Sequence, residues 1–223
     1  MANFAKTNRN KVRRLPERGA YDAATIYAIV DEALICHVGF VHEGQAFVIP
    51  TIHAREGDTI YLHGAKASRL LDHARQGESL CITVTLVDGI VAARSAFHSS
   101  MNYRSAVLFG CGQLVEDRAA KLHALEVLTE HVLPGRWAEV RPTTVKELNA
   151  TSVVAVTIES ASAKTRSGPP SDDEEDYALP IWAGVLPLSH EFLPPVPDPR
   201  LAEQLPLSAS VQNARRGRGD EPQ

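Results

Sequence analysis

Short runs of apolar and β-branched residues, broken by turn residues, fill much of the first half of the chain. The stretch ICHVGFVHEGQAFVIPTIHAREGDTIYLHG holds three such runs, separated by Glu43-Gly44 and by Glu56-Gly57-Asp58. Turn residues of this kind between β-rich runs are typical of hairpins. The pattern therefore predicts an antiparallel meander of three strands.

Three later stretches carry the same signal. SLCITVTLVDGIVAARSA predicts two strands that meet at a hairpin near Asp88-Gly89. SAVLFGCGQLV predicts a further long strand, and SVVAVTIESASAKT predicts a last one.

Three segments have helical rather than strand periodicity. Asp22 is placed to cap a helix over residues 22–34, which gathers its large apolar residues on one face. A short helix over residues 65–76 is expected to stop at Gly77, and an amphipathic helix is expected from Asp117 to His131. Few helices among many hairpin-linked strands predict a mainly β fold that closes into an antiparallel barrel, rather than a doubly wound sheet.

The two ends of the chain lack these periodicities. Residues 1–20 are polar and basic and are expected to form a flexible arm, followed by the barrel domain over residues 21–165. Residues 166–204 are rich in proline and predict an extended lid that packs on the barrel, and residues 205–223 predict a disordered tail. The acidic run over residues 172–176 is interpreted as a solvated loop.

Composition narrows the class of protein. The 223 residues carry a formal net charge of -4, so no global basic field favours a nucleic-acid partner. Three widely spaced cysteines, no apolar leader and no long apolar run favour a cytoplasmic protein without a membrane partner. Nine histidines without an HExxH motif or paired Cys/His spacing predict no dedicated metal site.

Candidate chemistry lies in the segment YLHGAKASR, where a strand leads directly into a helix. Lys66, Ser68 and Arg69 are donors and cations of the type that hold a phosphate beside free backbone N–H groups. An ordinary helix start, with Ser68 as the cap and both cations solvated, is an equally good interpretation of these residues alone.

A wider set of motifs resembles a known family. FVIPTIH, IYLHGAKASR, SAFHSSMNYRSAVLFG, LTEHVLPGRW, RSGPP and WAGVLPL occur in an order similar to that of the pyridoxamine-phosphate oxidase-like FMN-binding split barrels. The resemblance covers about residues 20 to 190 and is strongest to the flavin-nucleotide-binding and nitroimidazole-resistance-like branch. It implies an antiparallel split barrel of Greek-key type that forms a homodimer, with FMN at the interface.

The resemblance also implies which residues contact the flavin. The strand before the Gly-containing turn would run along the ring system, the turn would hold the phosphate and ribityl chain, and a later polar segment and the lid would complete the site. The expected cofactor-binding residues are Val48, Ile49, Pro50, Thr51, His53, His63, Gly64, Lys66, Ser68, Arg69, Asn102, Arg104 and Trp182. Trp182 has the alternative of a plain hydrophobic anchor. Oxidases of pyridoxamine phosphate use an arginine and a lysine around the strand that here reads Pro50 to His53, so activity on that substrate is not expected.

The hypothesis from sequence is an FMN-dependent oxidoreductase acting on a small molecule, with NADH or NADPH as a possible donor and nitro-aromatic reduction as a possible reaction. No side chain is assigned a catalytic role. Two alternatives stay open: a flavin-binding module without turnover, and a haem-binding or haem-degrading relative in which His53, His63 or His98 contacts the iron.

Overall fold

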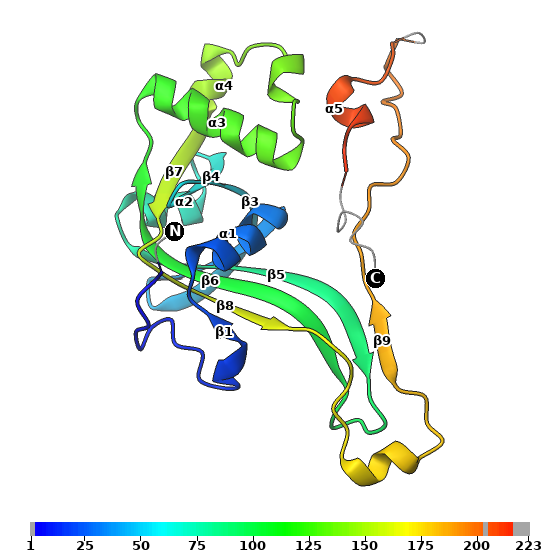
Figure 1. The fold of residues 1–223 in the computed structure, drawn as a ribbon. Coiled ribbons are helices and arrows are strands. Elements are labelled where there is room, and N and C mark those ends of the chain that lie inside the picture. The colour runs from blue at the N-terminus through cyan, green and yellow to red at the C-terminus, as the bar shows by residue number, and fades with distance from the viewer. Residues whose placement is uncertain (1–2, 203–204, 216–223) are drawn as a thin grey trace.

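The computed structural model describes residues 3–202 and 205–215. It is dominated by antiparallel strands, with helices of 3 to 15 residues outside the sheet (Figure 1). The strands are β1 (Gly19–Ala20), β2 (Ile35–His42), β3 (Gln45–Glu56), β4 (Thr59–Ala65), β5 (Ser79–Ala92), β6 (Ser100–Leu114), β7 (Thr151–Thr157), β8 (Ser160–Arg166) and β9 (Gly184–Pro187). The helices are η1 (Pro16–Arg18), α1 (Ala23–Glu32), α2 (Arg69–Arg75), α3 (Arg118–Val132), η2 (Trp137–Glu139), α4 (Val145–Ala150), η3 (Glu174–Ala178) and α5 (Ala209–Gln212).

The predicted antiparallel barrel is confirmed. Strands pair in the order β6, β7, β4, β3, β2 and β5, and β5 returns to β6, which closes the ring. β6 is shared along its length: its residues 103–109 pair with β8, whereas residues 112–114 pair with β7. This exchange of partners splits the barrel.

The turn signals of the meander hold in the structure. Glu43 and Gly44 both have positive φ, at 50° and 74°, and Gly57 has φ of 57°, as tight hairpins between β2, β3 and β4 require. Asp22 caps α1 by accepting a hydrogen bond from the Thr25 backbone N–H at 2.8 Å. These two local rules therefore place the first helix and the first three strands.

Two expectations about strands were wrong. Asp88-Gly89 is not a hairpin, because β5 continues through it to Ala92 with a bulge between Val87 and Gly89. At the bulge Gly89 lies close beside β9, which pairs with this end of β5, and an added Cβ would come within 2.8 Å of the Leu186 carbonyl oxygen. SVVAVTIESASAKT, predicted as one strand, forms β7 and β8, because the chain turns at residues 158–159 as it passes β6.

The core lies between the inner faces of the strands and the helices α1 and α2. Ile26, Ile29 and Val30 of α1 and Leu70 and Leu71 of α2 are at most 3% exposed and join the barrel's aliphatic residues in one cluster. Burying such a side chain contributes about 1.5–3 kcal/mol. The inner face of the barrel is therefore filled, and a ligand has only outer faces and strand ends to use.

The N-terminal residues lie against the barrel. Asn10 is 3% exposed, and its side chain donates to the carbonyl oxygens of Ala5 and Ala161 at 2.9 Å each. The backbone N–H of Val12 donates to the Tyr21 hydroxyl at 2.9 Å. The sequence predicts a flexible arm over residues 1–20, but residues 3–20 make specific contacts with β8 and with Tyr21, just before α1; residues 1–2 lie outside the described residues.

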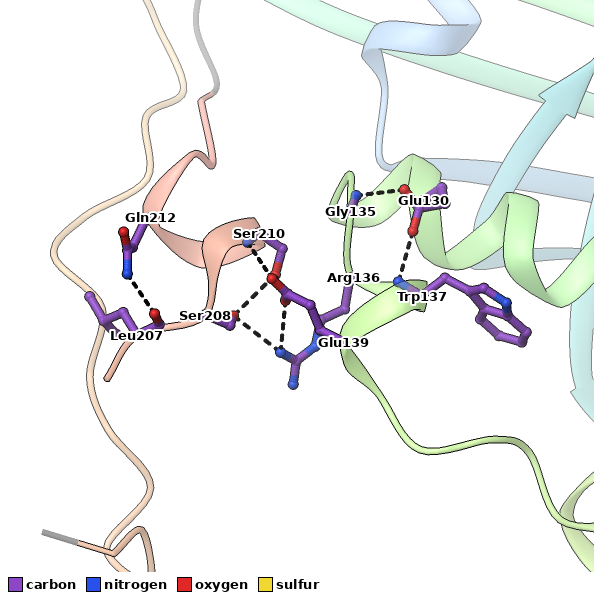
Figure 2. A network of polar contacts seen from close by, with 9 residues as sticks. All are labelled: Glu130, Gly135, Arg136, Trp137, Glu139, Leu207, Ser208, Ser210 and Gln212. Carbon is purple, nitrogen blue, oxygen red and sulfur yellow. Dashed lines mark hydrogen bonds and ion pairs between the residues drawn. The ribbon is translucent and has the colours of Figure 1, made fainter. Parts of the chain in front are cut away.

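The C-terminal segment departs from the barrel along the long β5–β6 hairpin and then returns toward α3 (Figure 1). Its far end docks on η2, where the Ser210 N–H donates to Glu139 at 2.8 Å and Arg136 contacts both Glu139 and Ser208 (Figure 2). α5 lies within residues 205–215, where the sequence predicts a disordered tail; residues 216–223 of that predicted tail lie outside the described residues. Within the described part of the chain, no helix has the length and hydropathy to span a bilayer.

A buried histidine links α1, β3 and α3. His53 is fully buried, with Nε2 3.0 Å from the Val30 carbonyl oxygen, and its ring centre lies 5.1 Å from that of His131. His131 in turn contacts the Ala33 carbonyl oxygen at 2.8 Å. Burial lowers the pKa of His53 from 6.5 to about 4, so this side chain is neutral at pH 7.

Stability should therefore depend on pH through His53. Below pH 6.5 the unfolded chain binds a proton at this residue that the folded chain rejects down to about pH 4. The contribution of His53 to the free energy of unfolding should be constant above pH 6.5. Between pH 6.5 and 4 this contribution should fall by roughly 3 kcal/mol. Urea unfolding across pH 4 to 7 should show a shallower fall for His53→Gln than for wild type. His190→Gln, at an exposed position, is the control, and an unchanged pH dependence in His53→Gln would contradict this assignment.

Candidate functional site

The turn from β4 into α2 packs against the core. The Ser68 N–H donates to the Ala65 carbonyl oxygen at 2.9 Å, and Ser68 occupies the N-cap position of α2 without using its side chain as a cap. Gly64 packs closely, because an added Cβ would lie 3.2 Å from the Leu71 side chain. The hydroxyl of Ser68 is thus free of the helix and available as a donor to a bound group.

Arg69 connects this turn to β3. Its guanidinium lies 4.5 Å from the centre of the Phe47 ring, a cation–π distance. Both Arg69 and Lys66 are exposed. Lys66 lies near enough to Lys121 to contribute to the lowered pKa of Lys121, whose main cause is burial. The turn therefore carries a positive potential beside strand β3.

Strand β3 offers an open backbone edge next to the turn. Its residues 45–52 pair with β2 on one side, whereas β4 pairs only with residues 53–56 on the other side. In the described part of the chain no strand covers the second edge over residues 45–52. Unpaired backbone N–H and C=O groups of this kind need a partner, and a planar polar ligand edge supplies one.

The predicted residues of β3 divide between two faces. Val48 is 66% exposed and Pro50 is also exposed on the outer face, whereas Ile49 packs against the core and His53 lies within the protein. Thr51 donates its hydroxyl to the Ile52 carbonyl oxygen at 3.3 Å. Val48 and Pro50 can therefore contact a ligand through their side chains, whereas Ile49, whose side chain packs against the core, can do so only through its backbone.

His63 lies on β4 just before the turn and is half-buried. Its Nδ1 atom is buried without a hydrogen-bond partner, and burial lowers its pKa. A buried ring nitrogen without a partner is uncommon in folded proteins and calls for a specific explanation, such as a bound ligand.

Three of the predicted contacts lie elsewhere in the chain. Asn102 is 7% exposed, donates to the Gly168 carbonyl oxygen at 3.1 Å and accepts from Arg166. Arg104 is bound by the carboxylates of Glu32 and Asp88, which hold its pKa above the usual value. The Asn102 side chain thus links β6 to β8 and to the segment after it, and the Arg104 side chain links β6 to β5 and α1.

Trp182, the third, is 67% exposed on the segment before β9 and flanks Gly184. The structure thus assembles the predicted residues of β3, β4 and α2 in one place and leaves Asn102, Arg104 and Trp182 apart from them. Within residues 3–202 and 205–215, no three metal-ligating side chains gather at one point.

Sequence reasoning missed an aromatic cluster beside Arg69. The Phe47 ring stacks on Phe40 at 5.6 Å, and the His73 ring lies 4.9 Å from Phe40 and 6.5 Å from His42. His73 is 6% exposed, and its Nε2 atom is buried without a partner. The available signal was the position of His73 between Leu70, Leu71 and Ala74 on the buried face of the predicted helix.

Two solved structures resemble nearly the whole chain. The flavocytochrome Anf3 from Azotobacter vinelandii is 42% identical, with 95% of this chain and 98% of that chain covered and a TM-score of 0.88. The FAD and heme binding protein from Mycobacterium smegmatis is 35% identical, with 90% and 98% covered and a TM-score of 0.86. A candidate 5-nitroimidazole antibiotic resistance protein from Bacteroides thetaiotaomicron is 26% identical over 64% of this chain and 83% of that chain, with a TM-score of 0.55.

No curated protein sequence matches the chain. The family model described as pyridoxamine 5'-phosphate oxidase matches residues 22–165, which span the barrel from α1 to β8. This match covers more than half of the chain and agrees with the closed antiparallel sheet. The chain belongs to the pyridoxamine 5'-phosphate oxidase-like family.

Proposed function

We propose that this protein binds a flavin nucleotide and haem and acts as an oxidoreductase on a small molecule. The observation that carries the proposal is the likeness, at 42% and 35% identity over nearly the full chain, to a flavocytochrome and to an FAD and heme binding protein. The open edge of β3 beside a cationic turn supports it independently.

The flavin would be held by residues that the structure already brings together. The open backbone edge of β3 faces outward next to the β4–α2 turn, so it would hydrogen-bond the polar edge of the ring system. The Ser68 hydroxyl, Lys66 and Arg69 would hold the phosphate. When bound, the flavin supplies hydride and electron transfer, which no side chain of the protein provides.

The protein's own contribution would be to position the flavin ring and to enclose it. Val48 and Pro50 present an apolar surface without a charged side chain, which favours a planar ring over a solvated anion. This strand carries neither an arginine nor a lysine over residues 48–53. The proposed substrate is therefore a small molecule other than pyridoxamine phosphate, with NADH or NADPH as the electron donor.

The identity of the flavin can be tested by its phosphate. FMN is the expectation from sequence, whereas the relative from Mycobacterium smegmatis is described as binding FAD. Parallel fluorescence titrations with riboflavin, FMN and FAD should show tight binding of a phosphorylated flavin and much weaker binding of riboflavin. Steady-state oxidation of NADH or NADPH by the loaded protein then separates an enzyme from a binding module.

Arg69→Ala should weaken binding of the phosphorylated flavin by about 1.5–3 kcal/mol, the scale of a hydrogen bond to a charged group. Arg75→Ala is the matched control, because Arg75 is an exposed arginine of the same helix whose partner is Asp72 at 2.6 Å. Equal affinities of the Arg69→Ala variant and wild type would move the phosphate away from this turn.

The proposed haem site is the aromatic cluster beside the turn, which reaches the surface at the half-buried rings of His42 and Phe47. His73 provides a buried ring nitrogen without a partner, Phe40 and Phe47 provide apolar surface, and Arg69 lies next to them as a cation for a carboxylate. Of the residues expected from sequence, His53 fits poorly because its Nε2 is bound to the Val30 carbonyl oxygen inside the core. His98, in the loop between β5 and β6, contacts the Asp173 carboxylate at 3.3 Å. His63, whose Nδ1 atom is buried without a hydrogen-bond partner, remains a second candidate.

Titration of the protein with haem should therefore produce a Soret band that depends on His73. His73→Gln should weaken haem binding by about tenfold or more, the loss typical of disturbing a metal ligand set. His123→Gln is the control, because His123 is exposed on α3 and contacts Glu56 at 2.9 Å. If His63→Gln lowers the band and His73→Gln does not, the haem lies at the end of β4 instead.

The proposed assembly is a homodimer with the flavin at its interface. The C-terminal segment is anchored at β9 and at α5, yet between these anchors Leu193 is 82% exposed and Val196 is 91% exposed. The outer face of the barrel also leaves Val41 60% and Val48 66% exposed. Two exposed apolar surfaces of this kind on one chain are satisfied when a second copy covers them.

Light scattering on the wild-type protein should accordingly give twice the 24.2 kDa mass of the chain. The double variant Leu193→Asp/Val196→Asp should shift the protein toward monomer and weaken flavin binding with it. Glu191→Gln/Asp198→Asn, at exposed positions in the same segment, is the control. A wild-type protein that is monomeric at micromolar concentration would remove the proposal.

A further inference from the structure

The N-terminal arm forms one wall of a cavity on the outer face of the barrel. The cavity has a volume of about 320 Å³ and is bounded by residues 9–14 of the arm and by residues of β6 and β8. Its floor consists of Ser105, Val107 and Phe109 of β6, and Lys164 of β8 lies beside them. This arm pocket is at the small end of the range for small-molecule sites, about 300–1,000 Å³.

The arm is held in place by buried contacts, so the wall does not depend on the ligand. The Asn10 side chain accepts hydrogen bonds from the backbone and hydroxyl of Thr7 at 2.7 and 3.1 Å while it donates to Ala161 on β8. Leu15, at the end of the wall, has φ of 53°, which a leucine adopts only when its surroundings require it.

The lining is strongly cationic. Five of the twelve lining residues are basic and none is acidic: the basic ones are Arg9, Lys11, Arg13, Arg14 and Lys164. Among residues 3–202 and 205–215, the one carboxylate within 4 Å of any of these cations is Glu159, at 3.8 Å from Arg9. Such a concentration of positive charge on a chain of net charge -4 repels itself and is relieved by a bound anion.

The floor adds a preference for a planar group. The Arg9 guanidinium lies 4.5 Å from the centre of the Phe109 ring and contacts Ser79, which fixes a flat cationic surface over an aromatic one. Val107 supplies further apolar surface. An anion with a planar ring fits these features better than a bare inorganic ion does.

We propose that the arm pocket binds the phosphate-bearing end of a nucleotide. Two sources share this chemistry. Phe109, Cys81, Gly39 and Val48 are consecutive cross-strand partners on β6, β5, β2 and β3, so the pocket lies on the same outer face as the proposed flavin strand. Three strand spacings, about 14 Å in total, separate Phe109 on the pocket floor from Val48 on the flavin strand. The nucleotide is therefore either a free one or, if the proposed flavin function holds, the adenylate end of FAD.

The test measures ADP, FMN and FAD affinities of the full-length protein by calorimetry at low salt. The variant Arg13→Gln/Lys164→Gln removes one cation from each wall. The control Arg118→Gln/Lys146→Gln removes the same charge at exposed positions on α3 and α4. Loss of charge-assisted contacts should weaken nucleotide binding about tenfold or more in the pocket variant and leave the control unchanged.

The pattern of losses identifies the source. A free nucleotide site predicts that ADP binding weakens while FMN and FAD binding stay the same. A cofactor site predicts that FAD binding weakens, FMN binding does not, and ADP competes with FAD alone.

The proposal is overturned if wild type binds no ADP at millimolar concentration and the FAD to FMN affinity ratio is the same in the pocket variant. It is also overturned if the control loses as much affinity as the pocket variant. Failure of both FMN and FAD to bind wild type would instead sink the proposed flavin function, while ADP binding would still support the arm pocket.

Discussion

The exchange of partners along β6 is the constraint on which the rest of the structure depends. At Gly110 an added Cβ would lie 2.0 Å from the Thr157 carbonyl oxygen, and at Gly112 it would lie 2.7 Å from Val154. Only glycine lets β7 approach β6 this closely at the point where β8 departs. Because β7 then pairs with β4, the barrel closes around the core and the β4–α2 turn is drawn to the outside of the same sheet.

This closure explains why the candidate site has an open backbone edge. Residues 59–65 of β4 pair with β7, and β4 pairs with β3 only over residues 53–56 of β3. Among the described residues, no strand therefore pairs with the first part of β3 on that side. The Arg69 guanidinium bridges the remaining distance by stacking on Phe47. Strand topology, rather than any single side chain, therefore creates the space next to the cationic turn.

The sequence predicts most of this architecture where local chemistry decides the outcome. Asp22 and the glycines at residues 44, 57 and 77 place helices and turns correctly because a cap or a positive φ is a local requirement. Asp88-Gly89 misleads because the same residue pair also suits a bulge, and the choice is made by distant partners: Arg104 binds the Asp88 carboxylate and β9 covers Gly89. Helical periodicity places His73 on the buried face of α2, but it does not show that His73 meets Phe47 and His42 of the β2–β3 hairpin, because that contact depends on tertiary packing.

Some cations of the protein have carboxylate partners, whereas those of the N-terminal arm have almost none. Carboxylates of α1, β5 and the loop after β8 are used in ion pairs, with Asp31 binding Arg55, Asp88 binding Arg104 and Asp172 binding Arg94. Each pair neutralises a cation near the barrel or its long hairpin, and the most buried of them, Asp172, also accepts from the Arg94 backbone N–H at 3.0 Å. The cations of the arm receive almost no such compensation, although the chain as a whole is acidic. A fold that pairs these three cations but concentrates five cations with one nearby carboxylate around a single cavity attracts anions to that cavity, because the field there is set by the nearest charges and not by the net charge.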